Sequence, residues 1–230
     1  MIHETEMGEL HYQMVRSLID DGLYPGNSRM AERLGVDDAQ MGERLRELAG
    51  IHGVVLDPHS GEPWVVHPFS LTPTMNWVEG ETRGWWAPCV WCALGVAALV
   101  GGRVTIHTRW GGESEPVAIP VDAGRPAAGP EMWVHFAIPP AQAWNNVHRH
   151  CALVLPFRSR EEIGAWCARH GIPPGEAVPL EQVAGLARTW YGRHADRDWR
   201  KWTIAEAQAI FRRAGLDSPF WDLGSVKGRF

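Results

Sequence analysis

The chain has 230 residues, of which 45% are hydrophobic, so it can bury a sizeable core as one large domain or two small ones. Its formal net charge of −5 argues against nucleic acid as a main partner, because phosphate binding needs a clustered positive surface. The longest apolar run, residues 93–100, is far shorter than the ~20 residues that span a bilayer, and no secretory signal is visible. We therefore expect a cytoplasmic protein without a membrane partner, in which the cysteines stay reduced.

Residues 1–67 are typical of a winged-helix-like domain. Apolar positions at helical spacing are followed by two short strands around a turn. A helix-turn-helix of this kind can bind DNA, but residues 38–49, which would be the recognition helix, have no net positive face. We therefore expect the domain to serve in packing. The predicted helices are residues 7–21, 28–34 and 38–49, and the predicted strands are residues 54–56 and 64–66.

Residues 68–230 form the second predicted domain. Its first segment, residues 68–74, has the composition of a linker or an extended crossover. The predicted strands are residues 104–108, 117–121, 133–138 and 152–157, and the predicted helices are residues 159–170, 180–191 and 204–214. The predicted fold class is therefore α+β, with an N-terminal winged-helix-like helical domain followed by a mixed β-sheet domain flanked by helices.

Three of the four cysteines lie in apolar segments that carry the chemistry of the chain. Cys89 and Cys92 are three positions apart, and Cys151 follows in a second apolar segment. The close pair is compatible with a redox pair at a helix start, with half of a zinc site that lacks a second pair, or with a three-thiolate site for a soft metal ion. Buried cysteines also occur simply as small hydrophobic residues, and we interpret Cys167 in this way.

The run Cys89-Val90-Trp91-Cys92 is followed by Ala97-Ala98-Leu99-Val100-Gly101, and Cys151 precedes Phe157-Arg158-Ser159. This pattern resembles the alkylmercury (organomercurial) lyase family. That family has Cys-x-x-Asp, an apolar helix ending in Pro-Ala-Leu-Ile-Gly, and a second active-site cysteine before Phe-x-Ser. The resemblance covers about residues 7–170 and is strongest over residues 85–121.

The resemblance implies a mechanism. In the family two thiolates engage the mercury of R–Hg⁺, and an acidic residue relays a proton to the carbon leaving group. Cys89 and Cys151 would be these thiolates. The hydrocarbon departs, and Hg²⁺ stays on the cysteines until a cellular thiol or a reductase removes it. No cofactor is required, and the expected partners are a small organometallic or apolar substrate and cellular thiols.

The chain departs from the family pattern at the proton relay. Cys92 stands where the family has aspartate, and a thiol with a reference pKa of ~8.5 is a different relay from a carboxylate. We assign Cys92 the role of proton donor or of third metal ligand. Trp110 stands where the family has a further cysteine. Other candidate acids are His148, His150, Asp122 and Glu131.

Two alternative functions are compatible with the same residues. The chain could be a non-catalytic protein that binds mercury or copper through Cys89, Cys92 and Cys151. It could also be a family member reused in small-molecule metabolism, because its many tryptophans suit an apolar or aromatic substrate. Those tryptophans are Trp85, Trp86, Trp91, Trp110, Trp133 and Trp144. No feature of the sequence sets the oligomeric state.

Overall fold

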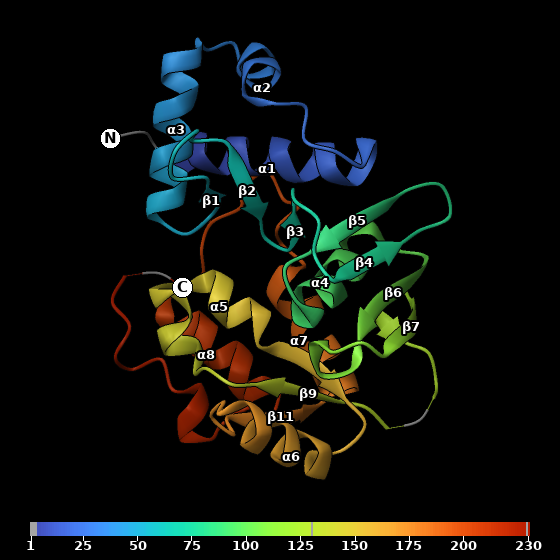
Figure 1. Cartoon of the computed structure of the whole chain (residues 1–230). Coiled ribbons are helices and arrows are strands. Elements are labelled where there is room, and N and C mark those ends of the chain that lie inside the picture. Colours follow the sequence, from blue (N-terminus) through green and yellow to red (C-terminus); the bar gives the residue numbers. More distant parts are fainter. Residues whose placement is uncertain (1–3, 130, 229) are drawn as a thin grey trace.

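Figure 1 shows a computed structural model of the chain, which describes residues 4–129, 131–228 and 230. The start of the predicted first domain, residues 1–3, lies outside the described residues. The helices are α1 (Glu4–Asp21), α2 (Asn27–Leu34), α3 (Asp38–Gly50), α4 (Val90–Val100), α5 (Val147–Ala152), α6 (Arg160–His170), α7 (Leu180–Tyr191) and α8 (Ile204–Arg213). The strands are β1 (Val55–Leu56), β2 (Pro63–Val66), β3 (Phe69–Ser70), β4 (Asn76–Glu79), β5 (Gly84–Ala87), β6 (Arg103–Arg109), β7 (Pro116–Asp122), β8 (Arg125–Pro126), β9 (Trp133–Phe136), β10 (Val154–Phe157) and β11 (Glu176–Pro179).

Helices α1, α2 and α3 pack together at one end of the molecule (Figure 1). The apolar residues Leu10, Met14 and Leu18 recur every four positions along α1 and are all buried, as an amphipathic helix requires. At the start of α3, the Asp37 side chain accepts a hydrogen bond from the backbone N–H of Gln40, and the Gln40 side chain accepts one from the N–H of Asp37. This capping box fixes where α3 begins.

The hairpin β1–β2 that follows α3 belongs to a larger sheet. Eight strands run in the order β1-β2-β3-β5-β4-β6-β7-β8. Strand β2 pairs with β3 through Val65 with Ser70 and Val66 with Phe69. One core cluster of buried residues extends from α1 to the C-terminal helices. The sheet and the core are therefore continuous across residue 67, and the domain boundary there stays a prediction.

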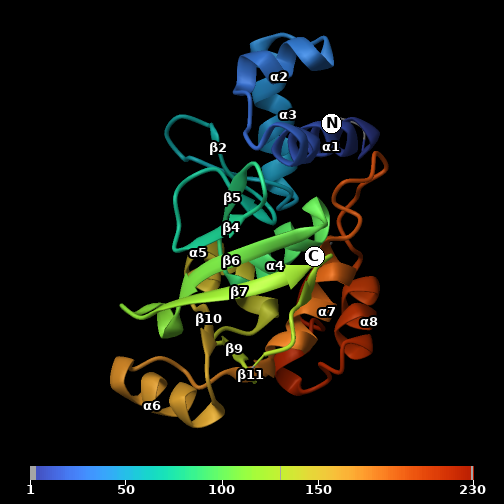
Figure 2. The ribbon, with the colours of Figure 1, turned by 90° about the vertical axis from the view of Figure 1, so that its right-hand side faces the viewer.

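Helix α4 lies in the interior, between this sheet and helix α7. All its residues from Val90 to Ala97 are buried, because it is apolar on every side. It contacts β4, β5, β6 and β10 as well as α7. Figure 2 shows α4 behind the long hairpin of β6 and β7. The N-terminal end of α4 is thereby enclosed by protein.

A second, three-stranded sheet has the order β10-β9-β11. Its strand β10 follows directly after α5, and α6 and α7 flank the sheet (Figure 1). The α+β class is as expected. Where we expected a mixed sheet, every pairing between described strands is antiparallel.

Several elements differ from the sequence expectation. Residues 68–74 contain strand β3 rather than only a linker, and β4, β5 and β11 were not expected. Helix α5 stands where we expected the start of a strand at residue 152. These elements are two to six residues long, too short to show a clear period in the sequence. Within the described residues, no helix has both the length and the apolar character needed to cross a membrane.

Candidate thiol site

Three sulfur atoms from distant parts of the sequence meet in the interior. Cys89 and Cys92 lie at the start of α4, Cys151 lies on α5, and the three Sγ atoms are all within 4.8 Å of one another. The side chains are 1%, 2% and 7% exposed, respectively. Among the described residues, no other three His, Cys, Asp or Glu side chains gather in this way. Three thiols so close together form a donor set for a soft, thiophilic centre.

The local structure of α4 turns its two cysteines to the same point. Cys89 is the N-cap residue, with extended backbone angles, and its Sγ accepts a hydrogen bond from the backbone N–H of Cys92 at 3.3 Å. A side chain that accepts from the third N–H of the helix is the usual N-cap arrangement. Both sulfurs therefore lie at the N-terminal end of α4, where the helix dipole favours a thiolate.

Cys151 reaches the same point from a short helix. Asn146 caps α5 by accepting a hydrogen bond from the backbone N–H of Arg149 at 3.0 Å. Strand β10, whose four residues are all buried, begins two residues after the helix ends and anchors it to the core. Cys151 is thus held against the start of α4 by the turn between α5 and β10.

The three thiols influence one another's ionisation. Burial opposes ionisation of Cys92, but hydrogen bonds from the Cys151 and Cys89 thiols and from His67 lower its pKa well below the usual value. Burial raises the pKa of Cys89, and its hydrogen bonds to the other two thiols raise it further. For Cys151, the hydrogen bond to Cys89 lowers the pKa, but the one to Cys92 and burial outweigh it and raise the pKa. Negative charge in the site is therefore most stable on Cys92.

Two further side chains contact Cys92 and were not expected from the sequence. The Tyr191 hydroxyl lies 3.4 Å and the His67 Nδ1 lies 3.8 Å from the Cys92 Sγ. Burial, and then the negative charge of Cys92, raise the pKa of Tyr191 well above its usual value, so its hydroxyl keeps its proton and donates to the sulfur. Neither residue belongs to a recognisable sequence motif. Tyr191 reaches the site through the packing of α7, and His67 reaches it through the turn after β2.

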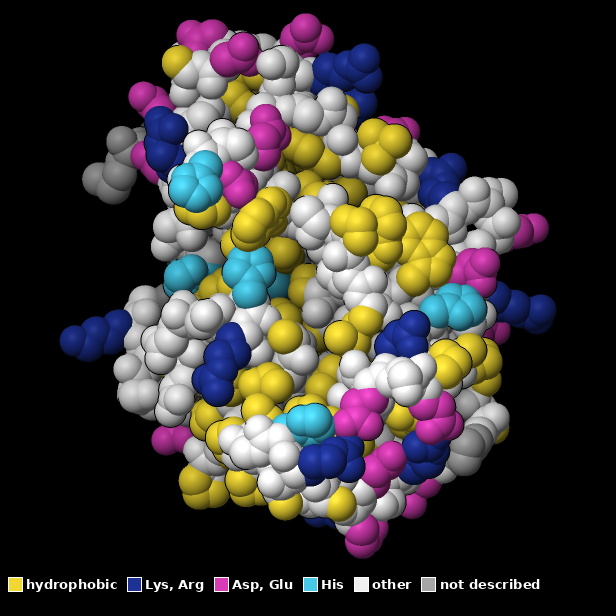
Figure 3. All heavy atoms as spheres, viewed as in Figure 1, with side chains coloured by type: hydrophobic (Ala, Val, Ile, Leu, Met, Phe, Trp, Pro, Cys, Tyr) yellow, Lys and Arg dark blue, Asp and Glu magenta, His cyan; other side chains and the backbone are white. Residues whose placement is uncertain are grey.

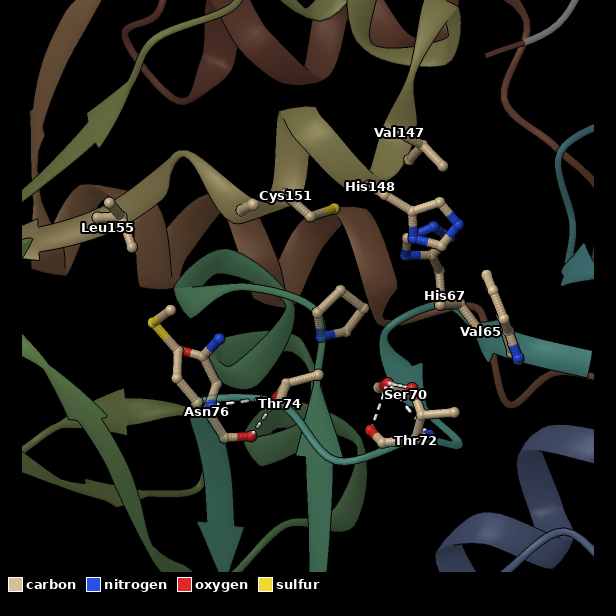
Figure 4. A pocket seen from close by; sticks show the side chains of 14 residues that line it. Val65, His67, Ser70, Thr72, Thr74, Asn76, Val147, His148, Cys151 and Leu155 are labelled. Carbon is tan, nitrogen blue, oxygen red and sulfur yellow. Dashed lines mark hydrogen bonds between the residues drawn. The ribbon is translucent and has the colours of Figure 1, made fainter. Parts of the chain in front are cut away.

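An open cavity of about 520 Å³ leads to Cys151. Its walls are largely apolar, and hydroxyl groups occupy one side; Figure 4 shows Cys151 and His148 on α5 facing Ser70, Thr72 and Thr74 across it. The space-filling view in Figure 3 shows a hollow between the two halves of this face, bordered by hydrophobic and histidine side chains. An organic group next to the sulfur atoms would lie in this cavity, which we call the outer cavity.

A smaller cavity of about 50 Å³ lies behind the thiols. Both cavities are lined by His67, Val147 and Cys151, and Cys92 lines the smaller one, which we call the inner cavity. Three basic residues that line the inner cavity have pKa values that burial lowers. The pKa of His150 is lowered to about 4, that of His194 to about 3 and that of Lys201 to about 7. His150 and His194 are therefore neutral near neutral pH, and Lys201 carries only part of its positive charge.

The other expected residues are spread more widely. His148 is exposed at the outer cavity and His150 is buried at the inner cavity. Asp122 and Glu131 are exposed, and no Asp or Glu side chain is among the described residues that line either cavity. Cys167 lies in a separate small core cluster, 3.6 Å from the His135 Nε2. Among the described residues that line the two cavities, there is therefore no carboxylate that could relay a proton.

The expected tryptophans have several different surroundings. Trp91 and Trp144 line the inner cavity, and the unexpected Trp64 lines the outer one. The guanidinium of Arg158 lies 4.5 Å from the centre of the Trp110 ring, away from the thiols. Only part of the tryptophan content is thus available to a bound molecule at this site.

Comparison with known proteins identifies the family of the chain. A family model described as alkylmercury lyase matches residues 69–192, a range that includes all three cysteines and Tyr191 but not His67. The chain therefore belongs to the alkylmercury lyase family. Its fold is similar to that in a crystal structure of the mercury-bound form of MerB2, with a TM-score of 0.61 and 18% sequence identity, covering 85% of this chain and 98% of that chain. No curated protein sequence matches the chain.

Proposed function

We propose that this chain is an organomercurial lyase that cleaves a carbon–mercury bond by protonolysis, with Cys89, Cys92 and Cys151 as the reacting groups. The observation that carries the proposal is the buried three-sulfur cluster beside a largely apolar cavity, in a member of the alkylmercury lyase family. The same chemistry applies to carbon bound to another soft metal or metalloid.

The resting charge of the site suits a cationic substrate. The lowered pKa of Cys92 and the raised pKa values of Cys89 and Cys151 favour one thiolate and two thiols. An R–Hg⁺ cation that enters the outer cavity then neutralises the charge of the Cys92 thiolate, which a buried site favours. The organic group R stays in the outer cavity, against its apolar wall.

The protons in the site balance the reaction. Cys151, the most exposed of the three, forms the first sulfur–mercury bond and passes its proton to the Cys92 thiolate. Cys89 then forms the second sulfur–mercury bond while the carbon–mercury bond breaks. The carbon takes the proton from Cys92, and Cys92 receives the proton that Cys89 gives up. The products are R–H, Hg²⁺ on two thiolates and a neutral Cys92 thiol, with mercury divalent throughout.

Cys92 therefore performs the task of the family aspartate: it takes a proton from a thiol and returns it to carbon. Hydrogen bonds from Tyr191 and His67 stabilise its thiolate in the absence of a carboxylate. Two cellular thiols then exchange onto the mercury and return protons to Cys89 and Cys151, and Cys92 releases its proton to solvent. No cofactor takes part in this cycle.

The test is an anaerobic assay of the reduced protein with phenylmercuric acetate and excess small thiol, with benzene measured by gas chromatography. We expect catalytic benzene release, reduced at least about 100-fold in Cys89→Ser and in Cys151→Ser. Cys167→Ser is the matched control, because this cysteine lies in a separate cluster. Full turnover in both site variants would show that the reaction does not use these thiols.

A second candidate function is metal binding without turnover, as a mercury- or copper-holding protein. The presence of a third sulfur where the family has a carboxylate favours it, because sulfur is the better soft-metal ligand. In that case the same assay would leave mercury bound at one equivalent and release no benzene.

A further inference from the structure

The site has three sulfur donors, but the proposed cleavage of a carbon–mercury bond leaves mercury bound to only two of them. In the reaction above mercury ends on two thiolates, and Cys92 remains as a thiol. Yet all three Sγ atoms lie within 4.8 Å of one another. The geometry is that of a triangle of sulfurs around one small centre.

Charge decides which centre can use all three sulfurs. Three thiolates around a divalent ion leave one net negative charge, and a buried uncompensated charge is costly. The three cysteine side chains are at most 7% exposed, so this charge would be buried. A trivalent centre leaves no net charge on the same three thiolates. A divalent ion is thus better matched to two sulfurs and a trivalent one to three.

We propose that Cys89, Cys92 and Cys151 together bind trivalent arsenic as a neutral three-sulfur adduct. Cys92 first takes up a proton from solvent, and arsenous acid, As(OH)₃, then condenses with the three thiols: three As–O bonds and three S–H bonds break, three As–S bonds and three O–H bonds form, and three water molecules leave. Arsenic stays trivalent, so the binding needs no oxidant or reductant. Trivalent arsenic prefers a pyramid of three soft donors, which matches a triangle of three sulfurs.

The outer cavity provides the route. Arsenous acid is uncharged at neutral pH and much smaller than the cavity of about 520 Å³. The hydroxyls of Ser70, Thr72 and Thr74 line the cavity and can hydrogen-bond its OH groups on the way in. Cys151 lines this cavity and forms the first As–S bond. Cys89 and Cys92 follow, each as an intramolecular contact with a high effective concentration.

Two arsenic probes separate a three-sulfur site from a two-sulfur site. Sodium arsenite needs all three thiols, whereas phenylarsine oxide binds two thiols and loses one water. We would measure the affinity of both probes for the reduced protein, for Cys92→Asp and for Cys167→Ser. Arsenic X-ray absorption of the arsenite complex counts the sulfur neighbours directly. Cys92→Asp restores the family's residue and leaves the other two thiols in place.

The expected result is one arsenic per chain with three sulfur neighbours in the unaltered protein. Arsenite affinity should fall at least about 100-fold in Cys92→Asp, because one arm of the chelate is lost. Binding of phenylarsine oxide should persist in that variant, which also shows that it is folded, and Cys167→Ser should bind both probes as before. Two sulfur neighbours in the unaltered protein, or equal arsenite affinity in Cys92→Asp, would overturn the proposal.

This inference does not depend on lyase activity, and the two can fail separately. Three-sulfur arsenic binding without benzene release from phenylmercuric acetate would keep this inference and remove the lyase. Benzene release together with two-sulfur arsenic binding would do the reverse.

Discussion

The hydroxyl of Tyr191 lies 3.4 Å from the Sγ of Cys92, although the two residues are 99 positions apart. Gly95, one turn further along α4, makes this approach possible: a Cβ there would lie 2.3 Å from the Tyr191 Cδ2. The contact between α4 and α7 therefore sets the surroundings of a thiol at the start of α4. It also supplies a hydrogen-bond donor beside the sulfur that we propose as the proton relay.

Removing the Tyr191 hydroxyl should destabilise the thiolate form of Cys92. In Tyr191→Phe the Cys92 thiolate loses one donor, so we expect its pKa to rise and benzene release to fall about 10-fold. The thiolate absorbance in the ultraviolet, followed against pH, measures the first effect. Tyr12→Phe, a partly exposed tyrosine beside Arg197, is the control. An unchanged titration and an unchanged rate would show that Tyr191 serves only in packing.

Filling the space at Gly95 should disturb the same contact from the other side. Gly95→Ala forces the Tyr191 ring away, so we expect a loss of about 1–3 kcal/mol in the free energy of unfolding, with lower benzene release. The control is Gly164→Ala on α6, where a Cβ would meet no atom within 4 Å. Alanine forms helices better than glycine, so this variant should gain about 1 kcal/mol in the free energy of unfolding. Equal stability changes in the two variants, measured by urea unfolding, would contradict the tight packing at Gly95.

The outer cavity should set the size of the organic group. Ala152 lines this cavity and is exposed, so Ala152→Trp can fill the space without disturbing the core. We expect the KM for phenylmercuric acetate to rise about 10-fold and that for a methylmercury salt to change much less. Ala168→Trp, at an exposed position on α6, is the control. Equal effects on both substrates would place the organic group elsewhere.

The buried histidines should make the fold sensitive to acid. Burial lowers the pKa of His194 to about 3 from an ordinary value of 6.5, so between these values the unfolded chain binds a proton that the folded chain does not. The contribution of this residue is present above pH 6.5 and is lost as the pH falls toward 3. His194→Asn keeps a donor for the His67 carbonyl, which His194 Nδ1 contacts at 2.9 Å.

We therefore expect His194→Asn to reduce the slope of unfolding free energy against pH by about 1.4 kcal/mol per pH unit in this range. Urea unfolding at several pH values measures the slope. The same slope in the variant and in the unaltered protein would mean that His194 is not held neutral in the folded chain.

Much of the fold was predictable because its longer elements carry strong local signals. Three local features of the sequence are also present in the structure. They are the helical spacing of the buried apolar residues on α1, the helix cap at Asp37 and the apolar run of α4. Strands β6 and β7 were predicted for the same reason. The short strands β3 to β5 and helix α5 were missed, because pairing with distant segments stabilises them more than their own sequence does.

The site was only half visible in the sequence. The spacing of Cys89 and Cys92 and the family pattern around Cys151 indicated which thiols to consider. His67 and Tyr191 carry no signal of their own, because a turn between strands and the packing of α4 against α7 bring them to Cys92. The carboxylates proposed as acids lie on the surface, where isolated charged residues are most often found.

The most direct test of the account is a single-turnover experiment without any added thiol. Reduced protein is mixed anaerobically with less than one equivalent of phenylmercuric acetate, and both benzene and protein-bound mercury are measured. Because the three thiols of the site supply the proton and hold the metal, the account predicts one benzene released for each mercury bound. Mercury bound to the protein with no benzene would contradict it and leave a metal-binding protein.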